Sequence, residues 1–181
     1  MMSHIINPDF FASAIRIAIP LALAGLGGVY SEKSGVVNIG LEGIMLTSAF
    51  AAVAATNFSG NVWVGILIAA IVGILLGLIH AIVTVSFKAN QIVSGVAINL
   101  FASGITVFLS WLWFHETQIM ALKSLPIWGF RVPNPEEASS LIKGLIVVFA
   151  HHSPMVYISF IIIVISNILI FRTPFGLRLR S

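Results

Sequence analysis

The chain has 181 residues, of which 59% are hydrophobic and 8% are charged, with a formal net charge of +3 and no cysteine. Soluble domains carry about 25% charged residues. This composition therefore excludes a soluble protein and indicates an integral membrane protein. The lack of cysteine excludes disulfides and thiol-based metal sites or catalysis, and the scattered positive charges argue against binding of nucleic acid.

Five apolar runs are each long enough to cross a bilayer as a helix, which takes roughly 20 residues. They cover residues 10–30, 36–56, 61–86, 90–114 and 154–171. Open strands would leave backbone groups unpaired in lipid, and the runs lack the alternation of barrel strands. The sequence therefore predicts an all-α integral membrane protein with about five transmembrane helices in a single domain over residues 1–181.

The connections between the runs predict how the helices are arranged. Short connections follow the first three runs, so the first four helices should be antiparallel neighbours. The long connection, 115–153, ends in LIKGLIVVFA at 141–150. This stretch is too short to cross the bilayer and too apolar to be exposed to solvent. It therefore predicts one short interfacial helix. Arg172, Arg178 and Arg180 favour a cytoplasmic C-terminus and an external N-terminus.

Polar residues interrupt the second run, where residues 31–46 read SEKSGVVNIGLEGIML. Asn38 and Glu42 are four residues apart and would share one helix face. A charge at bilayer depth costs at least roughly 2–3 kcal/mol, so such residues usually face a cavity or a partner. Three glycines permit close helix packing or an unwound segment of the kind that builds transporter sites: Gly35, Gly40 and Gly43.

Two interpretations of Glu42 stay open. In the first, Glu42 is structural and pairs with Lys33, Lys88 or a neighbouring helix. In the second, Glu42 and Asn38 line a route for a polar substrate through the membrane, because polar groups are retained at that depth mainly for such routes.

The fourth run carries a polar stripe with a spacing of four residues. Gln91, Gly95, Asn99 and Ser103 would lie on one helix face. Small residues let helices approach closely, and amides form hydrogen bonds between helices. The pattern therefore predicts packing roles for Gly95 and Ser103. Asn99 and Gln91 are also candidates for the substrate route.

No motif for catalysis or for a metal occurs in the sequence. Phosphate-binding loops, HExxH and Gly-x-Ser-x-Gly elements are all missing. The pair His151 and His152 has no further ligands at a suitable spacing, and His80 is interpreted as a packing residue rather than a proton relay. The residues alone thus predict a polytopic helical membrane protein with a candidate polar route, and they give no sign of an enzyme.

Three stretches together resemble the inner-membrane permeases of bacterial ABC importers for nucleosides. They are SEKSGVVNIGLEGIML, ANQIVSGVAINLFASGIT at 89–106 and RTPFGLRLRS at 172–181. The resemblance covers residues 10–181 and extends to a wider group that imports simple sugars and branched-chain amino acids. VNIGLEG at 37–43 is closer to the nucleoside branch than to the IDLSVG-like run of sugar permeases or the NFAHGE-like run of amino acid permeases.

The resemblance implies a multi-pass subunit of the bacterial inner membrane. It implies a heterodimer with a second permease subunit, two ATP-binding subunits and a substrate-binding lipoprotein. ATP and Mg would be bound by the ATPase partner, with no cofactor in this chain. In these permeases the last stretch begins the ATPase-coupling region, here Phe175, Gly176, Arg178 and Arg180. Further spans follow it there, so we expect the chain to be the N-terminal part of a larger permease.

The leading hypothesis is therefore a nucleoside permease in which Asn38, Glu42, Asn99 and Gln91 shape the substrate route. Three alternatives stay open at this point. The substrate could be a simple sugar, the chain could be an ion-coupled transporter in which Glu42 carries a proton, or it could be a truncated remnant without transport activity.

Overall fold

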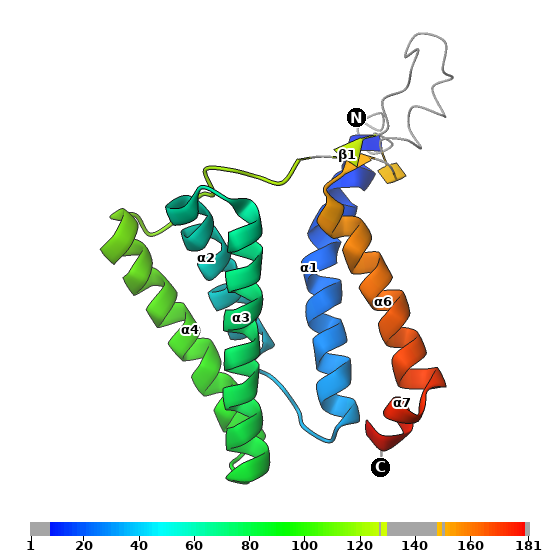
Figure 1. The fold of residues 1–181 in the computed structure, drawn as a ribbon. Coiled ribbons are helices and arrows are strands. Elements are labelled where there is room, and N and C mark those ends of the chain that lie inside the picture. Colours follow the sequence, from blue (N-terminus) through cyan, green and yellow to red (C-terminus); the bar gives the residue numbers. More distant parts are fainter. Residues whose placement is uncertain (1–7, 127, 130–147, 150, 180–181) are drawn as a thin grey trace, which may run out of the picture. The chain divides into compact units, whose positions relative to one another are not determined.

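The computed structural model describes residues 8–126, 128–129, 148–149 and 151–179. Among these residues, five helices are long and apolar enough to cross a membrane, and one further short helix follows them (Figure 1). This confirms the predicted all-α membrane fold. The interfacial helix expected at 141–150 lies outside the described residues, except for positions 148–149.

The described secondary structure consists of helices and one short pair of strands. In order they are α1 (Pro8–Lys33), α2 (Leu41–Ser59), α3 (Val62–Ala81), the π-helical turn η2 (Ile82–Ser86), α4 (Gln91–Phe114), β1 (Trp128–Gly129), β2 (His151–His152), α6 (Pro154–Arg172) and α7 (Pro174–Leu179). The two strands pair antiparallel, with Trp128 opposite His152.

The tight turns between the helices have local causes in the sequence. Gly60 ends α2 in the left-handed conformation, at φ 67°, which a residue without a Cβ adopts easily. Asn61 then caps α3 by accepting a hydrogen bond from the Trp63 N–H at 3.0 Å. Asn90 caps α4 in the same way, accepting from Ile92 at 2.9 Å. These caps explain why α2, α3 and α4 follow each other with so few connecting residues.

The second apolar run is helical only from Leu41, and the backbone from Ser34 to Gly40 is irregular. Gly35 has φ 80°, a backbone conformation that is unfavourable for residues other than glycine. It therefore allows the chain to turn after α1. The Ser31 hydroxyl supports this turn by donating to the Val36 carbonyl at 2.6 Å. The irregular segment therefore starts with a defined turn.

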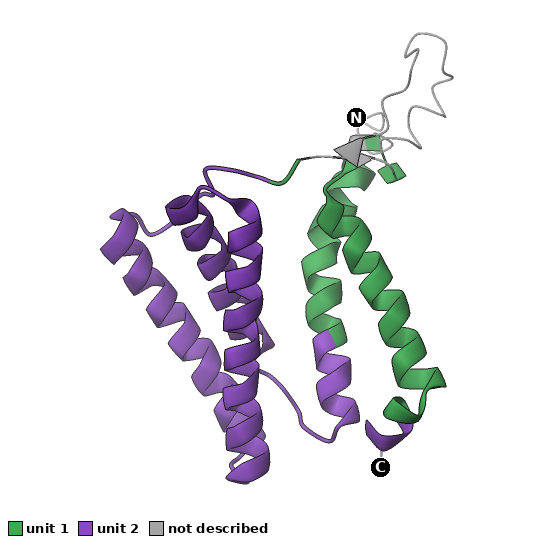
Figure 2. Ribbon diagram, viewed as in Figure 1, with its two compact units in different colours: residues 1–26, 125–176 green, residues 27–124, 177–181 purple. Residues whose placement is uncertain are grey.

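The described chain divides into two compact units, residues 1–26 with 125–176 and residues 27–124 with 177–181 (Figure 2). In the second unit α2 packs against both α3 and α4. Glycine makes the α2–α3 approach possible, because a Cβ on Gly65 would lie 2.6 Å from the Ala52 carbonyl oxygen. Close packing of small residues is the usual means of joining membrane helices.

Helices α6 and α7 join at a sharp bend. The Thr173 hydroxyl donates to the Leu169 carbonyl at 2.6 Å at the end of α6. Pro174 then begins α7, because its ring suits the first position of a helix. Gly176 lies so close to the Ile170 carbonyl that no Cβ would fit there. The bend thus depends on a proline and a glycine in fixed positions.

Candidate functional site

The irregular segment before α2 is held by side chains of α4. Gln91 accepts a hydrogen bond from the Val37 N–H at 2.7 Å and donates to the Gly35 carbonyl at 3.4 Å. A primary amide carries a donor and an acceptor, so a single side chain pairs with both kinds of backbone group. Gln91 thereby replaces hydrogen bonds that a continuous helix would have made within itself.

Asn99 repeats this arrangement two helical turns further along α4. Its side-chain oxygen accepts from the Gly43 N–H at 2.7 Å, and its side-chain nitrogen donates to the Ile39 carbonyl at 3.1 Å. Irregular backbone within an apolar run is tolerated only where protein groups or water satisfy it. Gln91 and Asn99 meet that requirement, and with Gly95 we refer to them as the α4 clamp.

Glycines bring the two backbones together inside this clamp. A Cβ on Gly95 would lie 2.8 Å from the Gly40 nitrogen. A Cβ on Gly43 would lie 2.8 Å from the Cα of Asn99. Real Cβ atoms do not approach other heavy atoms this closely, so the hydrogen bonds of Asn99 depend on the glycines beside it.

Asn38 and Glu42 occupy different surroundings at this site. Asn38 is half-buried and turns back on its own segment, accepting from the Gly40 N–H at 3.0 Å. Glu42 is exposed in the first turn of α2, where the helix dipole favours a negative charge. Within the described part of the chain, no ion pair joins Glu42 to Lys33 or Lys88. The acidic side chain thus lies open on the surface of this unit.

A groove of about 320 Å³ lies between α2 and α4, beyond the clamp. We call it the α2–α4 groove. Its lining residues are Leu46, Ala49, Phe50, Val53, Ser103, Thr106, Val107, Ser110, Thr117 and Ile119. Four of these residues carry hydroxyl groups, so the wall contributed by α4 is partly polar while the wall contributed by α2 is apolar.

The groove and the clamp share helix faces. Glu42 precedes the groove residue Leu46 by four positions on α2, and Asn99 precedes Ser103 by four positions on α4. Residues four apart lie on the same side of a helix. On α4, polar groups therefore continue from the groove to the clamp, and on α2 Glu42 lies one helical turn from the groove.

Sequence reasoning missed the groove hydroxyls Thr106 and Ser110. Both are buried, and the Thr106 hydroxyl donates to the Ala102 carbonyl at 2.7 Å within its own helix. A hydroxyl in an apolar helix can always bond in this way, so the residue type alone gives no signal of a groove. The spacing from Asn99 through Ser103 to Thr106 was the available clue.

The residues expected to begin the coupling region are in or next to α7. Phe175 is exposed, Gly176 is buried against Ile170, and Arg178 is exposed. Arg180 lies outside the described residues. The structure thus brings the first three together on one short helix.

The groups at this site are suited to binding through hydrogen bonds. In the described ranges, no three His, Asp or Glu side chains come together as metal ligands. The clamp amides and the groove hydroxyls of Ser103 and Thr106 bond to the protein itself. What the arrangement offers is a fixed backbone segment, a free carboxylate and a partly polar groove beside it.

Comparison with known proteins gives a family and several relatives. Residues 10–181 match the family described as branched-chain amino acid transport system / permease component. The chain is 41% identical over 173 residues to the guanosine ABC transporter permease protein NupQ of Bacillus subtilis, covering 91% of this chain and 52% of the relative. It is 34% identical over 176 residues to the nucleoside ABC transporter permease protein NupC of Lactococcus lactis, covering 94% and 54%.

A third relative is named for a different substrate and matches a shorter part of the chain. The putative glucose ABC transporter permease protein TsgC13 of Haloferax volcanii is 38% identical over 105 residues, covering 58% of this chain and 32% of the relative. The chain thus spans about half the length of the two nucleoside relatives. No solved structure matches it.

Proposed function

Because the chain belongs to the family of permease components of branched-chain amino acid transport systems, we propose that it forms a membrane-spanning part of an ATP-driven importer for nucleosides. Family membership and five apolar helices make it a multi-pass protein of the inner membrane and a transport component rather than an enzyme. The observation that carries the substrate proposal is the similarity to guanosine and nucleoside permeases over more than nine-tenths of the chain.

In the proposed mechanism, the α4 clamp and the segment from Gly35 to Gly43 shape the substrate route. The clamp fixes where the backbone runs, and so it sets the positions of Asn38 and Glu42. The hydroxyls of the α2–α4 groove offer hydrogen bonds of the kind that a ribose or a base needs. Asn99 and Gln91 are positioning residues here, since their own amides are already bonded to backbone groups.

The partners follow from the same proposal. A second permease subunit would complete a heterodimer, a lipoprotein would deliver the substrate, and two ATP-binding subunits would bind ATP and Mg. This chain itself would bind no cofactor. The exposed Phe175 and Arg178 of α7, followed by Arg180, would begin the surface that contacts an ATPase subunit. Gly176 would keep α7 against the end of α6.

A simple sugar is a second candidate substrate. Its support is the similarity to a putative glucose permease over 58% of the chain. Excess unlabelled glucose distinguishes the two candidates, because it would compete with uptake only if the importer accepts a sugar.

We expect deletion of the gene together with its operon neighbours to abolish uptake of labelled guanosine by whole cells. Complementation with the complete set should restore the uptake, and an ATPase-subunit variant that cannot hydrolyse ATP should not. Restoration with Glu42→Gln is expected to leave substantial uptake, because the amide keeps the polarity of the route. Unchanged uptake after the deletion would refute the proposal.

The ion-coupled alternative makes opposite predictions in the same assay. If Glu42 carried a proton, Glu42→Gln would abolish uptake, and a protonophore would stop uptake while the ATPase variant would not. Persistence of uptake with the ATPase variant would therefore exclude the ATP-driven mechanism.

A further inference from the structure

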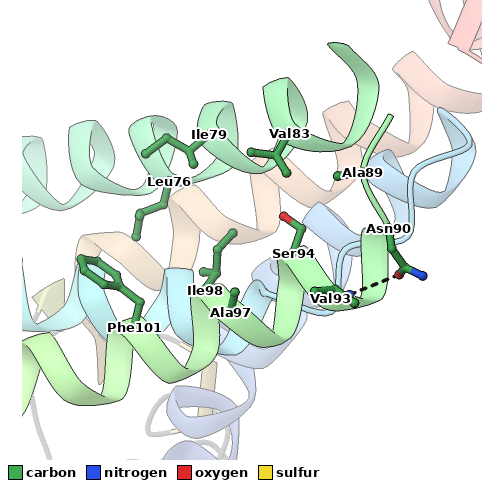
Figure 3. A pocket seen from close by; sticks show the side chains of 10 residues that line it. All are labelled: Leu76, Ile79, Val83, Ala89, Asn90, Val93, Ser94, Ala97, Ile98 and Phe101. Carbon is green, nitrogen blue, oxygen red and sulfur yellow. Dashed lines mark hydrogen bonds between the residues drawn. The ribbon is translucent and has the colours of Figure 1, made fainter. Parts of the chain in front are cut away.

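A second groove, of about 540 Å³, lies between α3 with η2 on one side and α4 on the other (Figure 3). We call it the α3–α4 groove. It exists because α3 and α4 both pack on α2 and make little contact with each other. Eight of its ten lining residues are apolar, among them Leu76, Val83, Val93 and Phe101. It is separate from the α2–α4 groove proposed for the substrate.

The two polar residues of this groove are already engaged. The Ser94 hydroxyl lies 3.0 Å from Nδ1 of His80, which is buried. The side-chain oxygen of Asn90 accepts hydrogen bonds from the first turn of α4, and Asn90 lies at one end of the groove (Figure 3). The walls between these residues therefore suit a hydrocarbon chain better than a polar solute.

The length of the groove corresponds to one leaflet. Asn90 and Phe101 are eleven residues apart on α4, which is about 16 Å at the rise of an α-helix. Half of the hydrocarbon core of a bilayer is about 15 Å. A groove that begins at the turn between η2 and α4 is thus long enough to reach about the middle of the membrane.

Lys88 provides a positive charge at the open end. It is the only Asp, Glu, Lys or Arg between Glu42 and Glu116. It directly precedes the lining residue Ala89, is exposed, and forms no ion pair within the part of the chain that the structure describes. The charge is therefore available at the level where lipid headgroups lie.

The backbone at Lys88 is held in a defined turn. Its φ is 53°, in the left-handed region that glycine adopts at lower cost than lysine. The neighbours hold it there, since the Phe87 N–H donates to Ile82 and the Ala89 N–H donates to Val83, both at 3.1 Å. The turn therefore fixes the position of Lys88 next to the lining residue Ala89.

We propose that the α3–α4 groove binds one acyl chain of an anionic phospholipid whose headgroup contacts Lys88. Charge complementarity and the one-leaflet length select this occupant over an uncharged lipid. The lipid would fill the space between α3 and α4 on the side of the membrane where residues 87–90 form a turn.

Competitive lipid binding to the purified chain, measured by native mass spectrometry, tests the proposal. Phosphatidylglycerol and phosphatidylethanolamine with identical acyl chains are supplied in equal amounts. We expect the wild type to prefer phosphatidylglycerol about fivefold, the effect of one lysine near an anionic headgroup. Lys88→Gly relieves the strained backbone, so it should fold and lose the preference. Lys33→Gly removes a charge elsewhere and should keep it.

A groove-filling variant tests the acyl-chain part separately. Ala97 is exposed in the groove, so Ala97→Leu should fold and should reduce binding of both lipids. The proposal is overturned if Lys88→Gly keeps the preference, if Lys33→Gly loses it equally, or if Ala97→Leu binds lipid like the wild type. Cross-linking of the groove to a helix of another subunit, without retained lipid, would also overturn it.

Discussion

Asn99→Leu is expected to lower the free energy of unfolding by about 2–4 kcal/mol, since the buried Gly43 N–H left unsatisfied costs about 1–3 kcal/mol and the lost bond to the exposed Ile39 carbonyl costs about 1 kcal/mol. The two groups are the Gly43 N–H and the Ile39 carbonyl, which Asn99 pairs at 2.7 and 3.1 Å. Leucine fills a similar space and offers neither a donor nor an acceptor. Reversible unfolding in mixed micelles, followed by circular dichroism, gives the free energy.

Gln91→Leu is the matched control for this prediction. Gln91 also pairs two backbone groups, but these belong to exposed Val37 and Gly35, where water can replace the amide. We expect a loss of at most about 1 kcal/mol, the net contribution of a solvent-accessible hydrogen bond. Equal losses for the two variants would mean that the two ends of the clamp do not differ in burial.

Gly43→Val is expected to be the more damaging steric change. The new Cβ would lie 2.8 Å from the Asn99 Cα and 2.9 Å from the Ile98 carbonyl oxygen, and neither backbone atom can move without shifting α4. Overpacking alone costs about 1–3 kcal/mol, and separating the helices also breaks the Asn99 hydrogen bonds. The same unfolding measurement should therefore give a loss of roughly 3–5 kcal/mol.

Gly104→Val is the control for Gly43→Val, since both place a valine in a helix that crosses the membrane. Nothing lies within 4 Å of a Cβ at Gly104. We expect its stability to change by less than about 1 kcal/mol, because valine has a better helix propensity than glycine. If the two variants lost the same free energy of unfolding, the close approach of the helices at Gly43 would make no contribution to stability.

Hydropathy was sufficient to predict the helical membrane fold, because only a long apolar run can bury its backbone in lipid. It could not predict that the second run is irregular before Leu41. A segment such as VVNIG is apolar enough for a helix, and its actual conformation depends on hydrogen bonds from residues more than fifty positions away. Local sequence does not contain those partners.

The four-residue spacing of the polar stripe predicted that its residues share one face of α4. It did not predict which groups that face contacts. Gly95 was predicted to pack, and a Cβ there would collide with the backbone at Gly40. The partners of Gln91 and Asn99 are main-chain groups of residues 35–43, and every residue has such groups. A sequence pattern therefore cannot identify them. The roles of Asn38 and Glu42 in transport stay a prediction.

The absence of cysteine allows one measurement that tests the proposed substrate route most directly. In cells that carry the complete importer, Glu42→Cys is labelled with a small hydrophilic thiol reagent, with and without guanosine. Leu100→Cys, at an exposed apolar position of α4, is the control. Our account predicts that Glu42→Cys is labelled and that guanosine slows its labelling severalfold, while Leu100→Cys shows no such protection. Labelling of Glu42→Cys that guanosine leaves unchanged would contradict a route past Glu42.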